Sequence, residues 1–99
     1  MPRKLRYADE AAGDLDAIAR WQTQPGSGTA GARRVRAIRA AIRGLKQNPC
    51  LYARGADPGT RELPCEGHRV VYAVEPDTGD NATAGDVTVL AVFGPGQAR

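Results

Sequence analysis

Aromatic residues are scarce in this chain of 99 residues, which has three Tyr, one Trp and one Phe. A core with so few rings must be mainly aliphatic, and 41% hydrophobic residues suffice for one modest core, so we expect a single domain over residues 1–99. No apolar run approaches the length of a membrane span, and the start, MPRKLRY, lacks the apolar segment of a signal peptide. These absences predict a cytoplasmic protein without a membrane partner.

Cysteine and histidine are also rare. Cys50 and Cys65 fit no zinc-binding spacing, and the single histidine, His68, cannot complete a ligand set. A disulfide between the two cysteines is possible, since both lie in predicted loops, but cytosolic proteins seldom keep one. We therefore expect neither a metal nor an organic cofactor.

A short strand at residues 4–7 and a first helix are predicted at the start of the chain. Asp9 can cap the helix, because its carboxylate can accept from the free N–H groups of the first turn. The apolar spacing carries the helix to about Gln24, with Asp14 and Asp16 facing outward.

The segment PGSGTAG at residues 25–31 ends that helix. A second helix is predicted over residues 30–48, capped by Thr29 and stopped before Pro49, since proline pushes the preceding residue out of the helical region. Apolar residues recur along it with helical spacing at Val35, Ile38, Ala41, Ile42 and Leu45.

Three strands are predicted in the second half, at residues 61–63, 68–75 and 86–93. In the last, Val87, Val89, Ala91 and Phe93 should share one face. The order β-α-α-β-β-β indicates an α+β fold, with a helical hairpin packed on one face of a small, mainly antiparallel sheet. Residues 94–99, GPGQAR, should form a flexible tail.

The second helix carries a basic stripe, by which we mean Arg36, Arg39, Arg43 and Lys46. Spacings of 3, 4 and 3 keep these side chains on one face, and no acidic residue lies between them. The stripe is typical of a surface for phosphates or for an acidic partner segment, but it is equally typical of the solvated face of an amphipathic helix.

A second polar cluster is predicted around the turn PCEG. If residues 61–63 pair with the strand that starts at His68, then Arg61, His68 and Arg69 lie near one edge of the sheet. Arginine offers a planar fork of donors for phosphate or carboxylate, and histidine is an acid or base near neutral pH. Alternatively, Glu62 or Glu66 neutralises an arginine and His68 merely begins the strand.

Four segments in this order resemble the RelE/ParE superfamily of bacterial type II toxins: ADEAAGDLDAIARW, AIRGLKQNP, TRELPCEGHRVVYAV and DVTVLAVF. The most specific part is Arg61-Glu62-Leu63 followed by HRVVYAV at residues 68–74, which is similar to a run in YoeB-type members. The resemblance covers residues 4–93.

The resemblance implies a toxin that is neutralised by a small, acidic, partly disordered antitoxin. It also implies that the toxin contacts operator DNA only through this antitoxin. RelE- and YoeB-type members cleave mRNA on the ribosome, whereas ParE-type members inhibit DNA gyrase. Arg69 falls on an arginine that contacts the scissile phosphate in the nucleases. Their remaining catalytic groups do not carry over, since Thr60 and Glu62 stand where lysines are expected and the end of the last strand offers only FGPGQ.

Three hypotheses follow. The first is a ParE-like block of gyrase, and the second is a ribosome-dependent endoribonuclease that uses Arg69, His68 and Arg61. The third is a degenerate member that only binds its antitoxin. The basic stripe is the expected surface for the antitoxin or for nucleic acid.

Overall fold

The computed structural model describes residues 2–26 and 28–95. Its elements confirm the predicted order β-α-α-β-β-β and the α+β class, with a short 3-10 helix, η1, after the second α-helix. They are β1 (Leu5–Tyr7), α1 (Asp9–Gln22), α2 (Gly28–Arg43), η1 (Gly44–Lys46), β2 (Thr60–Cys65), β3 (His68–Glu75) and β4 (Asp86–Phe93). Most of the predicted tail, residues 96–99, lies outside the described residues.

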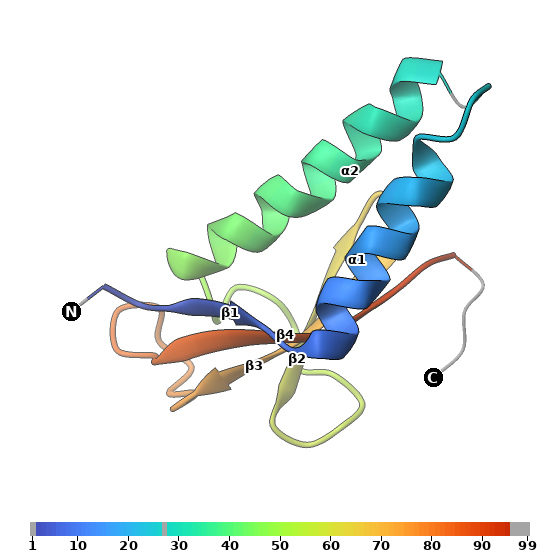
Figure 1. The fold of residues 1–99 in the computed structure, drawn as a ribbon. Coiled ribbons are helices and arrows are strands. Elements are labelled where there is room, and N and C mark those ends of the chain that lie inside the picture. Colours follow the sequence, from blue (N-terminus) through green and yellow to red (C-terminus); the bar gives the residue numbers. More distant parts are fainter. Residues whose placement is uncertain (1, 27, 96–99) are drawn as a thin grey trace.

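The strands form one sheet in the order β1-β4-β3-β2. β1 runs parallel to β4, and the pairs β2–β3 and β3–β4 are antiparallel, as is usual for strands that are consecutive in the chain. Both helices lie on the same side of this sheet, and their connected ends project beyond it (Figure 1). The sheet therefore has a helix-covered face and an open face.

Both predicted helix caps are wrong. Ala8 is the N-cap of α1 and makes no side-chain cap, while Asp9 and Glu10 lie in the first turn, where their charges suit the helix dipole. Thr29 lies inside α2, which begins at Gly28. The α-helix also ends earlier than the predicted residue 48: α2 ends at Arg43, and the 3-10 helix η1 follows it to Lys46.

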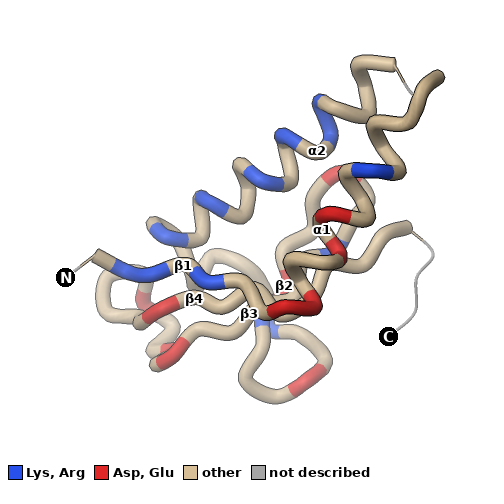
Figure 2. The backbone as a smooth tube through the Cα atoms, in the orientation of Figure 1, with Lys and Arg blue, Asp and Glu red and all other residues tan. Residues whose placement is uncertain are grey.

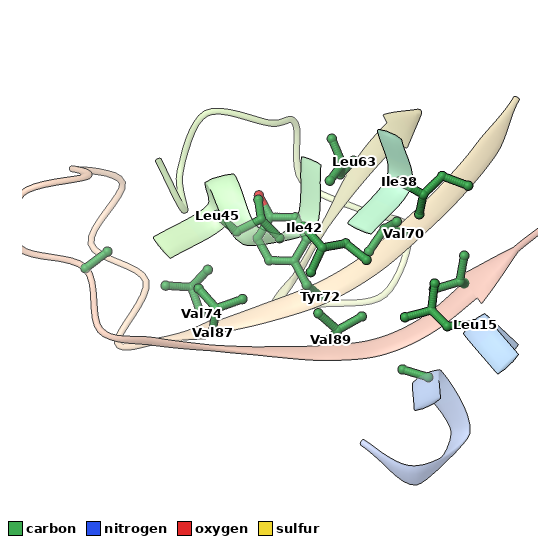
Figure 3. Close-up of a cluster of buried hydrophobic side chains, with 13 residues drawn as sticks. Leu15, Ile38, Ile42, Leu45, Leu63, Val70, Tyr72, Val74, Val87 and Val89 are labelled. Atoms are coloured by element: carbon green, nitrogen blue, oxygen red, sulfur yellow. The ribbon is translucent and has the colours of Figure 1, made fainter. Parts of the chain in front are cut away.

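The core lies between the helices and the covered face (Figure 3). Ile38, Ile42 and Leu45 are fully buried there, and they pack on the side of β3 that carries Val70 and Tyr72. These contacts confirm the apolar spacing predicted for the second helix, because the i, i+4 and i+7 positions share one helix face.

The predicted faces of β4 are wrong in its second half. Val71 pairs with Ala91 and Tyr72 pairs with Val89, so one extra residue of β4 interrupts the register. Such a bulge exchanges the faces of all later side chains. Val92 therefore joins the core, and Phe93 points to the open face with Ala91.

Asp14 does not simply face outward as predicted. Its Oδ2 atom accepts a hydrogen bond of 2.9 Å from the backbone N–H of Val92. β1 ends at Tyr7, which pairs with Val89, so the rest of β4 has no neighbouring strand on that side. The carboxylate of α1 thus satisfies a backbone donor at an edge that would otherwise be open.

Candidate functional site

The three residues of the predicted catalytic cluster do not share a site. Side chains alternate between the two faces of a strand, so the neighbours His68 and Arg69 point in opposite directions from β3. His68 lies on the helix-covered face with Val70, and Arg69 lies on the open face. The prediction that Arg61, His68 and Arg69 gather at one edge is therefore wrong.

Arg61 is a buried structural residue that is 7% exposed. It is paired in register with Tyr72 on the covered face. Its Nε and Nη2 atoms donate to the two carboxylate oxygens of Asp77 at 2.8 and 2.9 Å, and Nη1 donates to the carbonyl oxygen of Tyr52 at 2.7 Å. The guanidinium fork is occupied by a carboxylate of the same chain, so it is not available to a substrate phosphate.

Asp77 is the partner that sequence reasoning missed. It lies in the connection between β3 and β4, 16 positions from Arg61, and no local pattern distinguishes it from the other polar residues there. The hydrogen bond from Arg61 holds the pKa of Asp77 at about 2, and the same bond raises the pKa of Arg61. Both groups stay charged over the physiological range.

His68 is 5% exposed and begins β3 next to a tight turn. Its Nδ1 atom lies 2.8 Å from the carbonyl oxygen of Glu66. A carbonyl only accepts, so we assign a proton to Nδ1, which donates it to this oxygen. Within residues 2–26 and 28–95 the ring has no carboxylate partner, and it lies on the other side of the sheet from Arg69. His68 is therefore not placed to act with Arg69 on one phosphate.

The His68 ring instead lines a hollow of about 500 Å³ on the covered side of the sheet. The last turns of α1 contribute Ile18 and Trp21 to its wall, and Pro95 closes it from the end of β4. Trp21 is 70% exposed, the largest exposed fraction among the exposed large apolar side chains of the described residues. The lining of this hollow is mainly apolar, with the polar side chains of Gln22 and His68 among it.

Arg69 is the one member of the predicted cluster whose side chain is substantially exposed, at 38%. Its Nε atom lies 3.5 Å from Oε1 of Glu62, and its guanidinium carbon lies 5.1 Å from the centre of the Phe93 ring. The contact with Glu62 supports the alternative that a glutamate neutralises an arginine here. Carboxylate and ring together hold the guanidinium against the open face.

Around Arg69 the open face has a hollow of about 410 Å³. Glu62, Tyr52 and Arg54 line it beside Arg69, and Leu51, 62% exposed, forms an apolar wall. Cys50 and Cys65 are both free thiols, so no disulfide fixes the loop that carries Leu51.

The basic stripe belongs to α2 and η1, and basic positions recur along α2 in Figure 2. Arg36, Arg43 and Lys46 are exposed, while Arg39 is partly covered and lines a small hollow with Tyr7 and Asp16. The ion pairs found among the described residues use Arg6, Arg54, Arg61 and Arg69. The stripe thus presents cations that the fold itself does not use.

In the described part of the chain, no three His, Cys, Asp or Glu side chains are grouped as metal ligands. Nor does any helix in that part have the length and apolar content of a membrane span.

The comparisons with known proteins agree with this geometry. The sequence model of a family described as "ParE toxin of type II toxin-antitoxin system, parDE" matches residues 5–93. The chain belongs to the ParE toxin family. This membership confirms the predicted RelE/ParE resemblance over nearly the whole chain.

A solved structure from Pseudomonas aeruginosa, described as "Chromosomal ParDE TA system from P. aeruginosa", has a TM-score of 0.72. It is 20% identical, and the match covers 95% of this chain and 97% of that one, so it shows the same fold. The comparison with curated proteins gives no significant match.

Proposed function

We propose that this ParE-family protein blocks DNA gyrase by binding it, without a cleavage reaction of its own, and that an antitoxin neutralises it. The observation that carries the proposal is the separation of the predicted catalytic residues: His68 and Arg69 lie on opposite faces of β3, and Arg61 is bound to Asp77. The family match supports the same conclusion, because the family described is that of ParE.

RNA cleavage by a 2′-hydroxyl makes demands that this trio does not meet. A base must reach the attacking hydroxyl and a cation must reach the developing charge on the same phosphate, each within hydrogen-bond distance. Of the three residues, only Arg69 has a substantially exposed side chain, and even its Nε atom is buried. A protein that inhibits by binding needs complementary surface and no such constellation.

The hollow beside Trp21 is the surface that fits the antitoxin. Trp21 is exposed although it stands next to the partly buried Ile18, and a tryptophan in such a position is typical of an interface anchor. An amphipathic antitoxin segment that orders on binding can bury this apolar wall. The solved structure from P. aeruginosa is of a toxin–antitoxin system, which supports a partner of this kind.

The second candidate function is a ribosome-dependent endoribonuclease. One observation favours it: Glu62 and Tyr52 line the open-face hollow beside Arg69. These groups offer a base, an acid and a cation on one surface, although they are not the residues predicted from the sequence. His68 and Arg61 have no place in this version.

Two assays on the purified toxin separate the candidates. We expect it to inhibit gyrase supercoiling and to leave mRNA intact in a translation reaction analysed by primer extension. Codon-phased cleavage without an effect on supercoiling would establish the nuclease instead. No effect in either assay, together with normal growth on expression, would show that the chain only binds its antitoxin.

A further inference from the structure

Charge is strongly segregated along this chain. Residues 28–46, which form α2 and η1, contain six of the fourteen basic residues and none of the eleven acidic ones. This segment alone contributes +6, whereas the rest of the chain has eight basic and eleven acidic residues, and the net charge is only +3. The basic character of the protein therefore comes from one helical segment.

The basic stripe on this segment forms a nearly straight row. At 1.5 Å per residue, the ten positions from Arg36 to Lys46 span about 15 Å. Consecutive members are one helical turn apart, so their cations repeat roughly every 5 Å. Figure 2 shows basic positions recurring along the whole of α2.

The surroundings of the stripe decide between its candidate partners. The exposed large apolar side chains of the described residues are Tyr7, Trp21 and Leu51. None belongs to α2, although Tyr7 shares a hollow with Arg39. An amphipathic peptide needs an apolar anchor, and single-stranded RNA is usually held by stacking on successive aromatic rings. A single ring beside one arginine provides no such row, whereas a row of cations suits the regular phosphate backbone of a duplex.

We propose that the basic stripe binds duplex DNA directly, through its phosphates and without regard to base sequence. Arg36, Arg43 and Lys46 supply exposed cations, and the partly covered Arg39 between Arg36 and Arg43 adds a fourth. This binding goes beyond the proposed block of gyrase and does not depend on it. Because it reads no bases, it is distinct from recognition of an operator.

Fluorescence anisotropy with a labelled duplex of about 30 base pairs tests the proposal, over about 50 to about 200 mM salt. With four phosphate contacts, we expect log K to fall against log salt with a slope of about −3.6 for the unaltered protein. The variant Arg36→Gln, Arg43→Gln, Lys46→Gln should have a slope near −1 and bind roughly 100-fold more weakly, or worse, at about 100 mM salt.

A matched control removes the same charge elsewhere. Arg20 and Arg54 are exposed and lie outside both α2 and the N-terminal segment that contacts Lys46. The variant Arg20→Glu, Arg54→Gln changes the net charge by the same amount as the stripe variant and should leave the slope near that of the unaltered protein. Circular dichroism of both variants confirms that they are folded. Equal losses of DNA affinity in the two variants would show that binding depends only on net charge, which would overturn the proposal.

Two competitors identify the class of partner. The proposal requires that duplex DNA outcompete both single-stranded RNA of equal length and poly-glutamate of equal charge. RNA that competes equally well would overturn the assignment to a duplex. Poly-glutamate that displaces the DNA at equal charge would instead assign the stripe to an acidic protein segment, such as that of the antitoxin.

Discussion

Arg61 and Asp77 form a buried ion pair with two parallel hydrogen bonds, although 16 positions separate them in the sequence. Their side chains are 9% and 10% exposed. The pair fastens the connection after β3 to the edge strand β2, and it removes from the surface an arginine that the sequence had placed in the candidate site. In the folded chain the pair therefore acts as a stabilising element.

Replacement of Asp77 by Asn should destabilise the protein by about 3 kcal/mol, because it leaves a buried guanidinium without its counter-charge. Urea unfolding followed by circular dichroism measures this. Arg54 also lies near Asp77, at 3.5 Å, but its side chain is 59% exposed, so Arg54→Gln should cost less than about 1 kcal/mol. Similar losses in the free energy of unfolding for the two variants would contradict the claim that the buried Arg61–Asp77 pair stabilises the fold more than the exposed contact of Arg54 does.

The same pair predicts how stability depends on pH. The hydrogen bond from Arg61 holds the folded-state pKa of Asp77 at about 2, below the ordinary carboxyl value of about 3.9 in the unfolded chain. Its contribution is therefore complete above about pH 5 and is lost as the pH falls toward 2. We expect about 2 kcal/mol more acid destabilisation in the unaltered protein than in Asp77→Asn. Parallel stability curves for the two would contradict this.

The sequence predicted the element order and the core side of the second helix well, because those features depend on local spacing. Ile38, Ile42 and Leu45 could be placed by period alone. The candidate site was harder to predict, because it depends on which face of β3 each side chain occupies and on a distant partner. His68 and Arg69 are neighbours in sequence and separated by a sheet, and Asp77 is recognisable only once the chain is folded.

The β4 bulge shows the same limit. A strand without a bulge keeps strict alternation, so the sequence placed Phe93 with Val89. One extra residue moved Phe93 to the open face, where it supports Arg69. No residue type near Leu90 is typical of a bulge, so the sequence predicts regular alternation of side chains between the two faces.

Two glycines in the helices should respond in opposite ways to substitution by alanine. A methyl group at Gly31 would overlap the backbone carbonyl of Gln22, where α1 and α2 approach each other, whereas Gly13 has open space around it. We expect Gly31→Ala to destabilise by about 2 kcal/mol or more, and Gly13→Ala to stabilise by up to about 1 kcal/mol through helix propensity. Thermal unfolding measures both, and a neutral Gly31→Ala would contradict the close helix packing.

The Trp21 hollow should carry much of the antitoxin affinity. We expect Trp21→Ala to weaken the complex at least about 10-fold, because a truncated aromatic anchor leaves its pocket unfilled. Leu51→Ala is the matched control, since Leu51 is also well exposed but lines the hollow on the open face. Isothermal titration of each variant with the antitoxin measures the effect, and an unchanged affinity for Trp21→Ala would remove the hollow from the interface.

The most direct test of the central claim measures gyrase supercoiling and mRNA integrity with the paired variants Arg69→Ala and Glu62→Gln. If the protein acts on gyrase by binding and without catalysis, mRNA should stay intact with the unaltered toxin and with both variants. All three proteins should inhibit supercoiling. Codon-phased mRNA cleavage by the unaltered toxin that disappears in both variants would contradict the account and establish a nuclease site on the open face.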